Sequence, residues 1–289
     1  SRGMIRIKRV DHIAMGAPDW RAQADWLERV LGFRFLGHFP DHGEGFEGCT
    51  LQVPGTDIEF EIIAPTRPDS FLQRFLDNDG PGLHHIAIEV DDIEETAAEM
   101  ERLGLTPFGG IRDDGSWRFT FIHPKESGGV LWQPFVPKDG SAPVARQEGG
   151  IGGLVGLVRV DHVSVAVPDI ERQIAFQERV FGMEVEGRWQ SEAEGYAGAV
   201  LRIPNSRLKF EIIAPIREES FVAKFIRERR PGLHHITAEV ESVDAAVAAL
   251  RQAGIEPWGG IVDNGWKRHT FIHPKQSGGV LFQLFEEPR

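Results

Sequence analysis

The sequence lacks several features that would each point to a class of protein. Its 289 residues include one cysteine, Cys49, so no intramolecular disulfide can form and we expect a reducing, cytoplasmic location. No apolar run approaches the roughly 20 residues that cross a bilayer, and no N-terminal signal pattern is present, so we expect no membrane partner. The sequence has fewer basic residues than acidic ones, 32 Lys and Arg against 44 Asp and Glu. The formal net charge of −12 argues against a nucleic-acid partner, because phosphate binding relies on clustered Lys and Arg.

Three motifs are present twice, at a constant spacing of 150 positions. They are "RVDHIAMGAPD" and "RVDHVSVAVPD" from Arg9 and Arg159, "FEIIAP" from Phe60 and Phe210, and "TFIHPKESGGVL" and "TFIHPKQSGGVL" from Thr120 and Thr270. The halves align without a net gap, which indicates a tandem duplication. Residues 136–153 are rich in Gly, Pro and Ser, as is typical of a linker. We therefore predict domains at 4–140 and 154–289.

Each half contains a fainter internal repeat. "VDHIAMGAPDWRAQADWLERVLGF" indicates a strand, a turn and a helix ending at Gly32, and "LHHIAIEVDDIEETAAEMERLGL" indicates the same order with its helix ending at Gly104. Asp19 and either Asp91 or Asp92 suit N-caps, and the two glycines suit C-caps. Three short β-rich stretches follow each helix. The sequence thus predicts an α+β fold of four βαβββ modules, two in each half.

Strand alternation brings histidines and a glutamate to similar faces of the two halves. In the strand 83–90, Ile86 and Ile88 mark the core side, so the neighbouring His85 points to the opposite, concave face. His84 is then interpreted as a packed residue, like His234. The candidate ligands are His12, Glu61 and His85, copied as His162, Glu211 and His235. Two imidazoles and a carboxylate are a common inner shell for a divalent transition metal, so we expect two metals per chain.

On the motifs "VDHIAMGAPD", "FEIIAP", "GLHHIAIEVDDIE" and "FIHPKESGGVLWQ" and their copies, the chain resembles the vicinal oxygen chelate superfamily, which includes glyoxalase I and extradiol dioxygenases. The closest likeness is to the methylmalonyl-CoA epimerases. The resemblance covers nearly all of both halves, and implies that paired modules form U-shaped sheets around a divalent metal ion such as Mn, Co, Fe, Ni or Zn. It implies a fourth ligand on each last strand, giving His12, Glu61, His85 and Gln133, and His162, Glu211, His235 and Gln283. A substrate with two vicinal oxygens, such as an acyl-CoA or a catechol, would fill the remaining positions.

The chain departs from the epimerases in the residues that transfer protons. The resemblance implies two opposed bases, which fall here on Cys49 and Gln133 in the first half and on Ala199 and Gln283 in the second. Glutamine cannot accept a proton at neutral pH, so methylmalonyl-CoA epimerisation itself is not expected.

The remaining catalytic candidates are Glu44 and Glu194, which occupy matching positions in the stretches "HGEGFEG" and "EAEGYAG". The alternative is that both are solvated loop carboxylates. His123 and His273, in the two "IHPK" motifs, are interpreted as fixing the turn before the last strand.

The leading hypothesis is a divalent-metal-dependent enzyme that polarises a carbonyl or acyl group for isomerase or lyase chemistry. The first alternative is an Fe(II) extradiol-type or keto-acid dioxygenase. The second is a small-molecule binding protein resembling bleomycin-resistance proteins. We expect a pseudo-dimeric monomer or a homodimer. Differences such as Trp117 against Lys267 leave room for one site to have lost activity.

Overall fold

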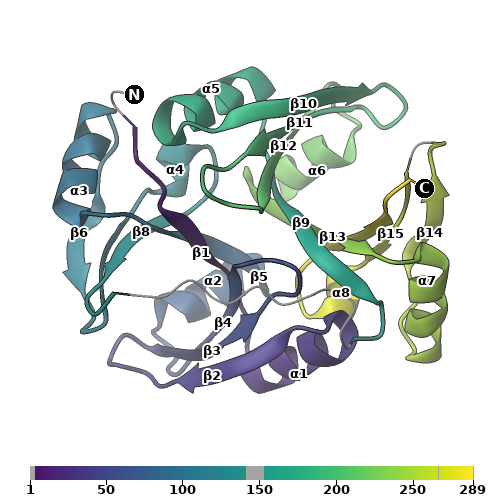
Figure 1. Cartoon of the computed structure of the whole chain (residues 1–289), viewed down its shortest axis with the longest axis horizontal. Helices are drawn as coiled ribbons and strands as arrows, with labels where there is room; N and C mark the ends of the chain where they lie inside the picture. Colours follow the sequence, from purple (N-terminus) through teal and green to yellow (C-terminus); the bar gives the residue numbers. More distant parts are fainter. Residues whose placement is uncertain (1–3, 141–152, 266, 289) are drawn as a thin grey trace. The chain divides into compact units, whose positions relative to one another are not determined.

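The computed structural model describes residues 4–140, 153–265 and 267–288 (Figure 1). Most of the predicted linker, residues 141–152, lies outside them. The first half contains β1 (Arg9–Gly16), α1 (Trp20–Leu31), β2 (Arg34–Phe39), β3 (Phe46–Gln52), β4 (Glu59–Pro65), α2 (Phe71–Asp79), β5 (Gly82–Glu89), α3 (Ile93–Arg102), β6 (Phe108–Asp113), β7 (Trp117–Phe121), α4 (Pro124–Ser127) and β8 (Trp132–Pro137). The second half contains β9 (Leu157–Ala166), α5 (Ile170–Phe181), β10 (Glu184–Ser191), β11 (Tyr196–Arg202), β12 (Lys209–Pro215), α6 (Phe221–Glu228), β13 (Gly232–Val240), α7 (Val243–Gln252), β14 (Trp258–Asp263), β15 (Arg268–Ile272), α8 (Pro274–Ser277) and β16 (Phe282–Glu286).

The strands form two eight-stranded sheets, one from each half of the sequence. The first has the order β2-β3-β4-β1-β5-β8-β7-β6, and the second has the equivalent order β10-β11-β12-β9-β13-β16-β15-β14. β5 pairs in parallel with β8, whereas β2 to β4 and β6 to β8 pair antiparallel. The prediction of an α+β fold built from two repeated pairs of βαβββ modules is confirmed.

The helices begin and end close to the predicted caps. Asp19 is the N-cap of α1, and Gly32 ends that helix in the left-handed conformation at φ 72°, which favours glycine. Asp92, the second of the two candidates, caps α3. That helix ends on Leu103, with Gly104 one residue beyond at φ 81°. None of the helices in the described ranges is long and apolar enough to cross a bilayer.

Two helices that the sequence did not predict, α2 and α6, connect the modules of each half. Ser70 and Ser220 cap them. The aromatic side chains of these helices hold the first histidine of each doublet: His84 lies edge-on to Phe75 and His234 lies edge-on to Phe225, both with ring centroids 4.8 Å apart. The interpretation of these two histidines as packed residues is confirmed, and burial lowers the pKa of His84 to about 4.

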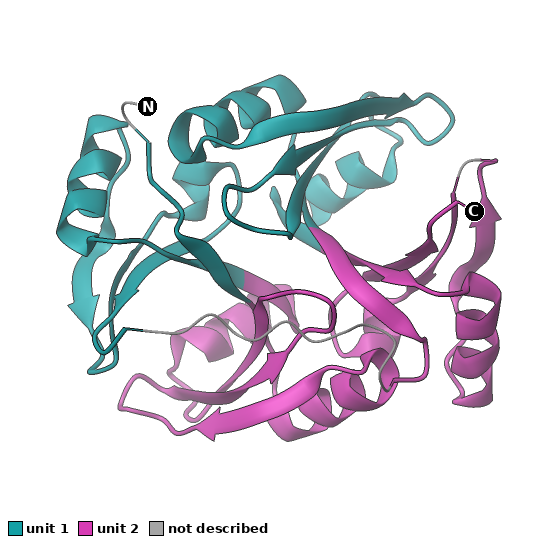
Figure 2. Cartoon of the chain, viewed as in Figure 1, with its two compact units in different colours: residues 1–12, 85–143, 163–234 teal, residues 13–84, 144–162, 235–289 magenta. Residues whose placement is uncertain are grey.

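The chain divides into two compact units, one formed by residues 1–12, 85–143 and 163–234, and one by residues 13–84, 144–162 and 235–289 (Figure 2). Within the first unit, the buried Trp132 of β8 packs against Phe181 and Phe210, with ring centroids 4.7 and 5.7 Å apart. The buried amide of Gln173 donates a hydrogen bond of 2.9 Å to the carbonyl of Ser127. Residues from both sequence halves therefore share the core of this unit.

The second unit repeats these contacts with the halves exchanged. Trp26 of α1 stacks on Phe282 of β16, with centroids 6.1 Å apart. The amide of Gln23 donates to the carbonyl of Ser277 at 2.8 Å. Sheets follow the halves of the sequence, whereas each compact unit draws one module from each half. The domain boundaries 4–140 and 154–289 stay a prediction.

Candidate metal centre

Two histidine side chains meet between neighbouring strands of the first half. His12 comes from β1 and His85 from β5, both are buried, and their Nε2 atoms lie 3.2 Å apart. The Nδ1–H of His12 donates to the carboxylate of Asp11 at 2.7 Å, which leaves the Nε2 lone pair directed at His85. Two nitrogens held about 2.1 Å from one ion at about 90° would lie about 3 Å apart. The spacing therefore fits two ligands of a common metal.

A glutamate completes each group of possible ligands. One ligand atom from each member lies within 4.8 Å of the others in two groups: His12, Glu61 and His85, and His162, Glu211 and His235. In each sheet the three residues come from three successive strands, β4-β1-β5 and β12-β9-β13. The donor set of two imidazoles and one carboxylate matches the chemistry of a divalent transition metal. The structure thus brings together the residues that strand alternation selected.

A buried chain of charges supports His12. Nη2 of Arg9 donates to Asp11 at 2.5 Å, and Nε of Arg9 donates to Glu89 at 2.8 Å. Burial opposes ionisation of Asp11, but the hydrogen bond from His12, together with the charge and hydrogen bond of Arg9, holds the pKa of this carboxyl below its usual value. A carboxylate of this kind fixes the tautomer of a metal-binding imidazole. Asp11 was not singled out from the sequence, although the repeated "RVDH" contained the signal.

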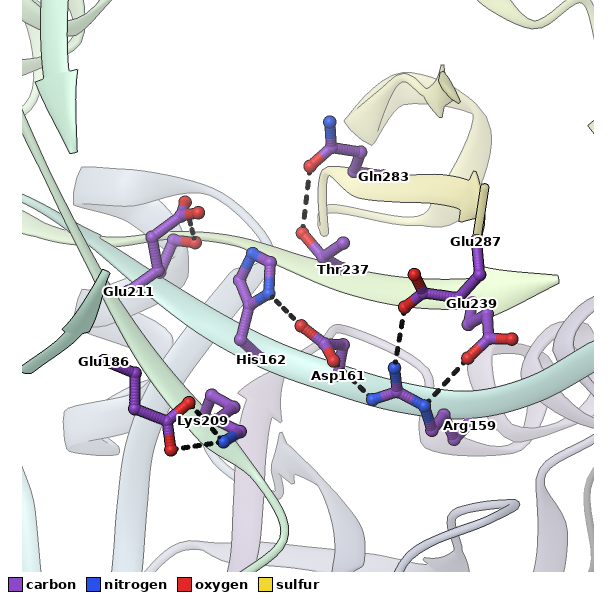
Figure 3. Close-up of polar contacts among 11 residues, drawn as sticks. Arg159, Asp161, His162, Glu186, Lys209, Glu211, Thr237, Glu239, Gln283 and Glu287 are labelled. Atoms are coloured by element: carbon purple, nitrogen blue, oxygen red, sulfur yellow. Dashed lines mark hydrogen bonds and ion pairs between the residues drawn. The ribbon is translucent and has the colours of Figure 1, made fainter. Parts of the chain in front are cut away.

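The second half reproduces this arrangement (Figure 3). The carboxylate of Asp161 accepts the Nδ1–H of His162 at 2.7 Å, and Arg159 donates to Asp161. Arg159 also donates to Glu239 at 2.8 Å and to Glu287 at 3.3 Å. Burial opposes ionisation of Asp161, yet His162 and Arg159 lower the pKa of its carboxyl. Both candidate centres therefore have the same supporting carboxylate.

The two glutamines predicted as fourth ligands lie at equivalent positions of β8 and β16. Gln133 lies opposite Ala87 in the parallel register of β5 and β8, and Gln283 lies opposite Thr237 in that of β13 and β16. The hydroxyl of Thr237 donates to Oε1 of Gln283 at 3.0 Å (Figure 3). Each glutamine thus lies on the strand next to one that carries a candidate histidine.

The carboxylates of the two groups also differ in their neighbours. In the second half, Ser164 donates to Oε1 of Glu211 at 2.6 Å. The position equivalent to Ser164 in the first half is Ala14, which has no hydroxyl to offer Glu61. Together with Thr237, Ser164 gives the second centre two hydroxyl groups that orient candidate ligands.

The side chain at one position that the resemblance assigned to a base faces away from the candidate site. In the register of β3 and β4, Thr50 lies opposite Glu61, whereas Cys49 lies opposite Ile62. Cys49 and Ile62 are both fully buried, and burial followed by the charge of Glu61 raises the pKa of the Cys49 thiol to about 12. The side chain at this position therefore points into the core, and a base elsewhere stays a prediction. Ala199, opposite Ile212, is placed in the same way.

The catalytic candidates Glu44 and Glu194 lie in the exposed connections β2–β3 and β10–β11. The backbone of the first connection is held by Asp41, which accepts the N–H groups of Gly43 and Gly45 at 2.8 and 3.1 Å. Both glutamates are thus presented from hairpins, and their catalytic role stays a prediction.

His123 and His273 cap the single-turn helices α4 and α8. Nδ1 of each ring accepts the N–H of the residue two positions later, Lys125 or Lys275, at 3.0 Å. The interpretation that these histidines fix the turn before the last strand is confirmed.

Residues 11–121 and 161–272 both match the Glyoxalase/Bleomycin resistance protein/Dioxygenase superfamily. The chain therefore belongs to this superfamily and contains two copies of its unit, in agreement with the paired βαβββ modules and the two groups of candidate ligands.

Individual relatives match parts of the chain. The mitochondrial methylmalonyl-CoA epimerase of Homo sapiens is 33% identical over 136 residues, which cover 46% of this chain and 76% of the relative. The 3-dehydroshikimate dehydratase of Pseudomonas aeruginosa is 24% identical over 247 residues, or 80% of this chain and 36% of the relative. Among solved structures, a mutant of 4-hydroxymandelate synthase from Streptomyces coelicolor superposes with a TM-score of 0.72 at 15% identity, covering 97% of this chain and 92% of that one. This last likeness shows the fold.

Proposed function

We propose that the chain is an enzyme that holds a divalent metal ion in each His–Glu–His group, and that metal bound in at least one of them polarises a carbonyl or acyl group of a small molecule. The observation that carries this proposal is the pair of Nε2 atoms of His12 and His85, 3.2 Å apart, with the tautomer of His12 fixed by Asp11. When bound, the metal would stabilise an oxyanion developing on the substrate by several kcal/mol. Gln133 and Gln283 would be the fourth ligands.

The side chains favour isomerase or lyase chemistry with one base. Epimerisation needs a second base on the opposite face of the substrate, and glutamine at positions 133 and 283 cannot be that base. Glu44 or Glu194 would remove a proton from the carbon next to the carbonyl, leaving its electron pair as an enolate. In an isomerase the carboxylic acid would return the proton to another atom of the enolate, and in a lyase the enolate would expel a leaving group from the adjacent carbon. The names of relatives, an epimerase and a dehydratase, agree with proton abstraction next to an oxygen-bearing carbon.

The donor set also suits a second candidate function. Two histidines and one carboxylate are the ligands of many ferrous oxygenases, so an Fe(II) extradiol-type or keto-acid dioxygenase is the alternative. A fourth protein ligand weighs against it, because glutamine would occupy a position that substrate or oxygen needs. Oxygen consumption by the iron-loaded chain with a catechol or a 2-keto acid would identify the dioxygenase, whereas turnover without oxygen would identify the isomerase or lyase.

Metal stoichiometry tests the proposal directly. Elemental analysis of the purified chain should give two divalent ions per chain, and Glu61→Ala and Glu211→Ala should each lower the value to about one. Glu101→Ala, at an exposed position of α3, is the matched control and should leave it at two. Full metal content in the double variant would refute the assignment of the ligands. A wild-type chain that binds no metal would instead favour a small-molecule binding protein.

A further inference from the structure

The side chains of β7 and β8 that lie beside the first candidate centre differ in chemistry from those at the equivalent positions of the second half. We call each such group of side chains the wall of its centre. In the first half, Trp117 stacks on Phe135 with ring centroids 3.7 Å apart and lies against the ring of His12 at 5.8 Å. Phe119 lies opposite Phe135 in the register of β7 and β8, and both belong to a buried cluster with Ala87. This wall is aromatic, and it lies against the ring of a candidate ligand, His12.

The equivalent wall of the second half is polar. The ammonium of Lys267, at the position of Trp117, lies 3.9 Å from the ring centroid of Phe285, which is equivalent to Phe135. His269 replaces Phe119 and lies opposite Phe285. Thr237 replaces Ala87 and donates to Gln283. Three apolar positions of the first half thus carry polar groups in the second.

The charge of Lys267 lies on the same side of the sheet as Gln283. His269 and Phe271 are two residues apart on one face of β15, and they lie opposite Phe285 and Gln283 of β16. Burial of the His269 ring, followed by the positive charge of Lys267, lowers the pKa of His269. A cation on the face of the sheet that carries a predicted metal ligand is suited to an anionic group of a substrate that chelates the metal.

Resting on the proposed function, we propose that the second half alone binds substrate, that the substrate is a small carboxylate with a metal-chelating pair of oxygens, and that Lys267 binds its anionic group. In the first half the indole of Trp117 fills the equivalent space beside His12. That centre would hold its metal without admitting the carboxylate. The duplication would then have produced one substrate site and one centre that binds metal only.

Oxalate is a suitable probe, because it is a small dicarboxylate with two vicinal oxygens. Isothermal titration of oxalate into the full chain loaded with Mn²⁺ should give one oxalate per chain, although the chain holds two metals. Lys267→Met should lower the affinity at least about tenfold, the usual effect of losing a hydrogen bond to a charged group. Lys267→Arg should retain most of it. Lys224→Met, at an exposed position of α6, changes the charge equally and should have no effect.

The reciprocal variant tests the role of the tryptophan. Trp117→Lys should raise the stoichiometry from one oxalate per chain to two. If this variant does not fold, the comparison of Lys267→Met with Lys224→Met decides alone. Two equal oxalate sites in the wild-type chain, no oxalate binding to the two-metal chain, or affinity insensitive to Lys267→Met would each overturn the inference while leaving the metal centres intact. A chain that takes up no metal would instead contradict the proposed function.

Discussion

The hydroxyl of Thr237 donates to Oε1 of Gln283 across 3.0 Å, whereas the equivalent Gln133 lies opposite Ala87, which has no hydroxyl. The two candidate centres therefore share their predicted ligands and differ in the groups that orient them. Groups that orient ligands typically change metal affinity 10–100-fold, so the two centres should bind metal unequally.

Thr237→Val should weaken metal binding at the second centre by about tenfold, because Gln283 loses the donor that fixes its amide. Competition with a chromophoric chelator for Zn²⁺ would resolve the tighter and weaker sites. Thr237→Ser keeps the hydroxyl and should restore the affinity. Ala87→Thr, the reciprocal change, should strengthen the first centre. Equal affinities in all variants would show that the hydroxyl has no role in metal binding.

Asp11→Asn should lower metal affinity at the first centre 10–100-fold, because an amide no longer imposes the tautomer that leaves Nε2 of His12 unprotonated. The measurement is the same chelator competition. Asp161→Asn should affect only the second centre. Asp91→Asn, at an exposed position close in sequence to His85, is the control. A loss of the same size in that control would point to a general charge effect instead.

Strand alternation could bring the candidate ligands to one face because each lies in a strand with one strongly apolar face, and their role as metal ligands stays a prediction. His84 and His85 are adjacent in sequence, yet one packs on aromatic rings of α2 and the other meets His12. The helical caps were predictable for a different reason: they depend on a few residues that are close in sequence.

The face on which Cys49 lies is one feature that the local pattern does not determine. Whether Cys49 or Thr50 shares a face with Glu61 depends on the register between β3 and β4, and a shift of one residue exchanges the faces. The packing of Trp132 on Phe181 joins residues of different halves, which no local pattern reveals. The position of the Lys267 ammonium over the ring of Phe285 likewise depends on tertiary packing and has no signal in the local sequence.

Gln23→Ala should destabilise the chain by about 1–3 kcal/mol, because the buried carbonyl of Ser277 loses its donor. Gly278→Ala should also destabilise it. Gly278 has φ 83°, and a Cβ there would lie 1.9 Å from Oε1 of Gln23. Urea unfolding followed by circular dichroism measures both effects. Gln276→Ala, at an exposed position of α8, should leave the stability unchanged. Wild-type stability of Gln23→Ala would show that this hydrogen bond adds nothing to the core.

The thiol of Cys49 should not react with thiol reagents at pH 8 while the protein is folded. It is fully buried, and its pKa is raised to about 12, so almost no thiolate is present. Labelling with a chromogenic disulfide should occur only as the chain unfolds in denaturant. Cys49→Ala should give no signal under any condition. Rapid labelling of the folded protein would show that β3 opens or that the thiol faces solvent.

Acid should release the β2–β3 connection that carries Glu44. The hydrogen bond from Thr66, and then those from the backbone N–H groups of residues 43–45, lower the pKa of Asp41 from its usual 3.8 to about 2. Because the folded-state pKa lies below the unfolded value, the stabilisation is complete above about pH 4 and is lost as the pH falls through about 2. An NMR titration of the Asp41 carboxyl measures this directly. Thr66→Val should move the pKa back towards 3.8, and Thr66→Ser should not. An unshifted pKa in the wild-type chain would mean that Asp41 does not hold this connection in solution.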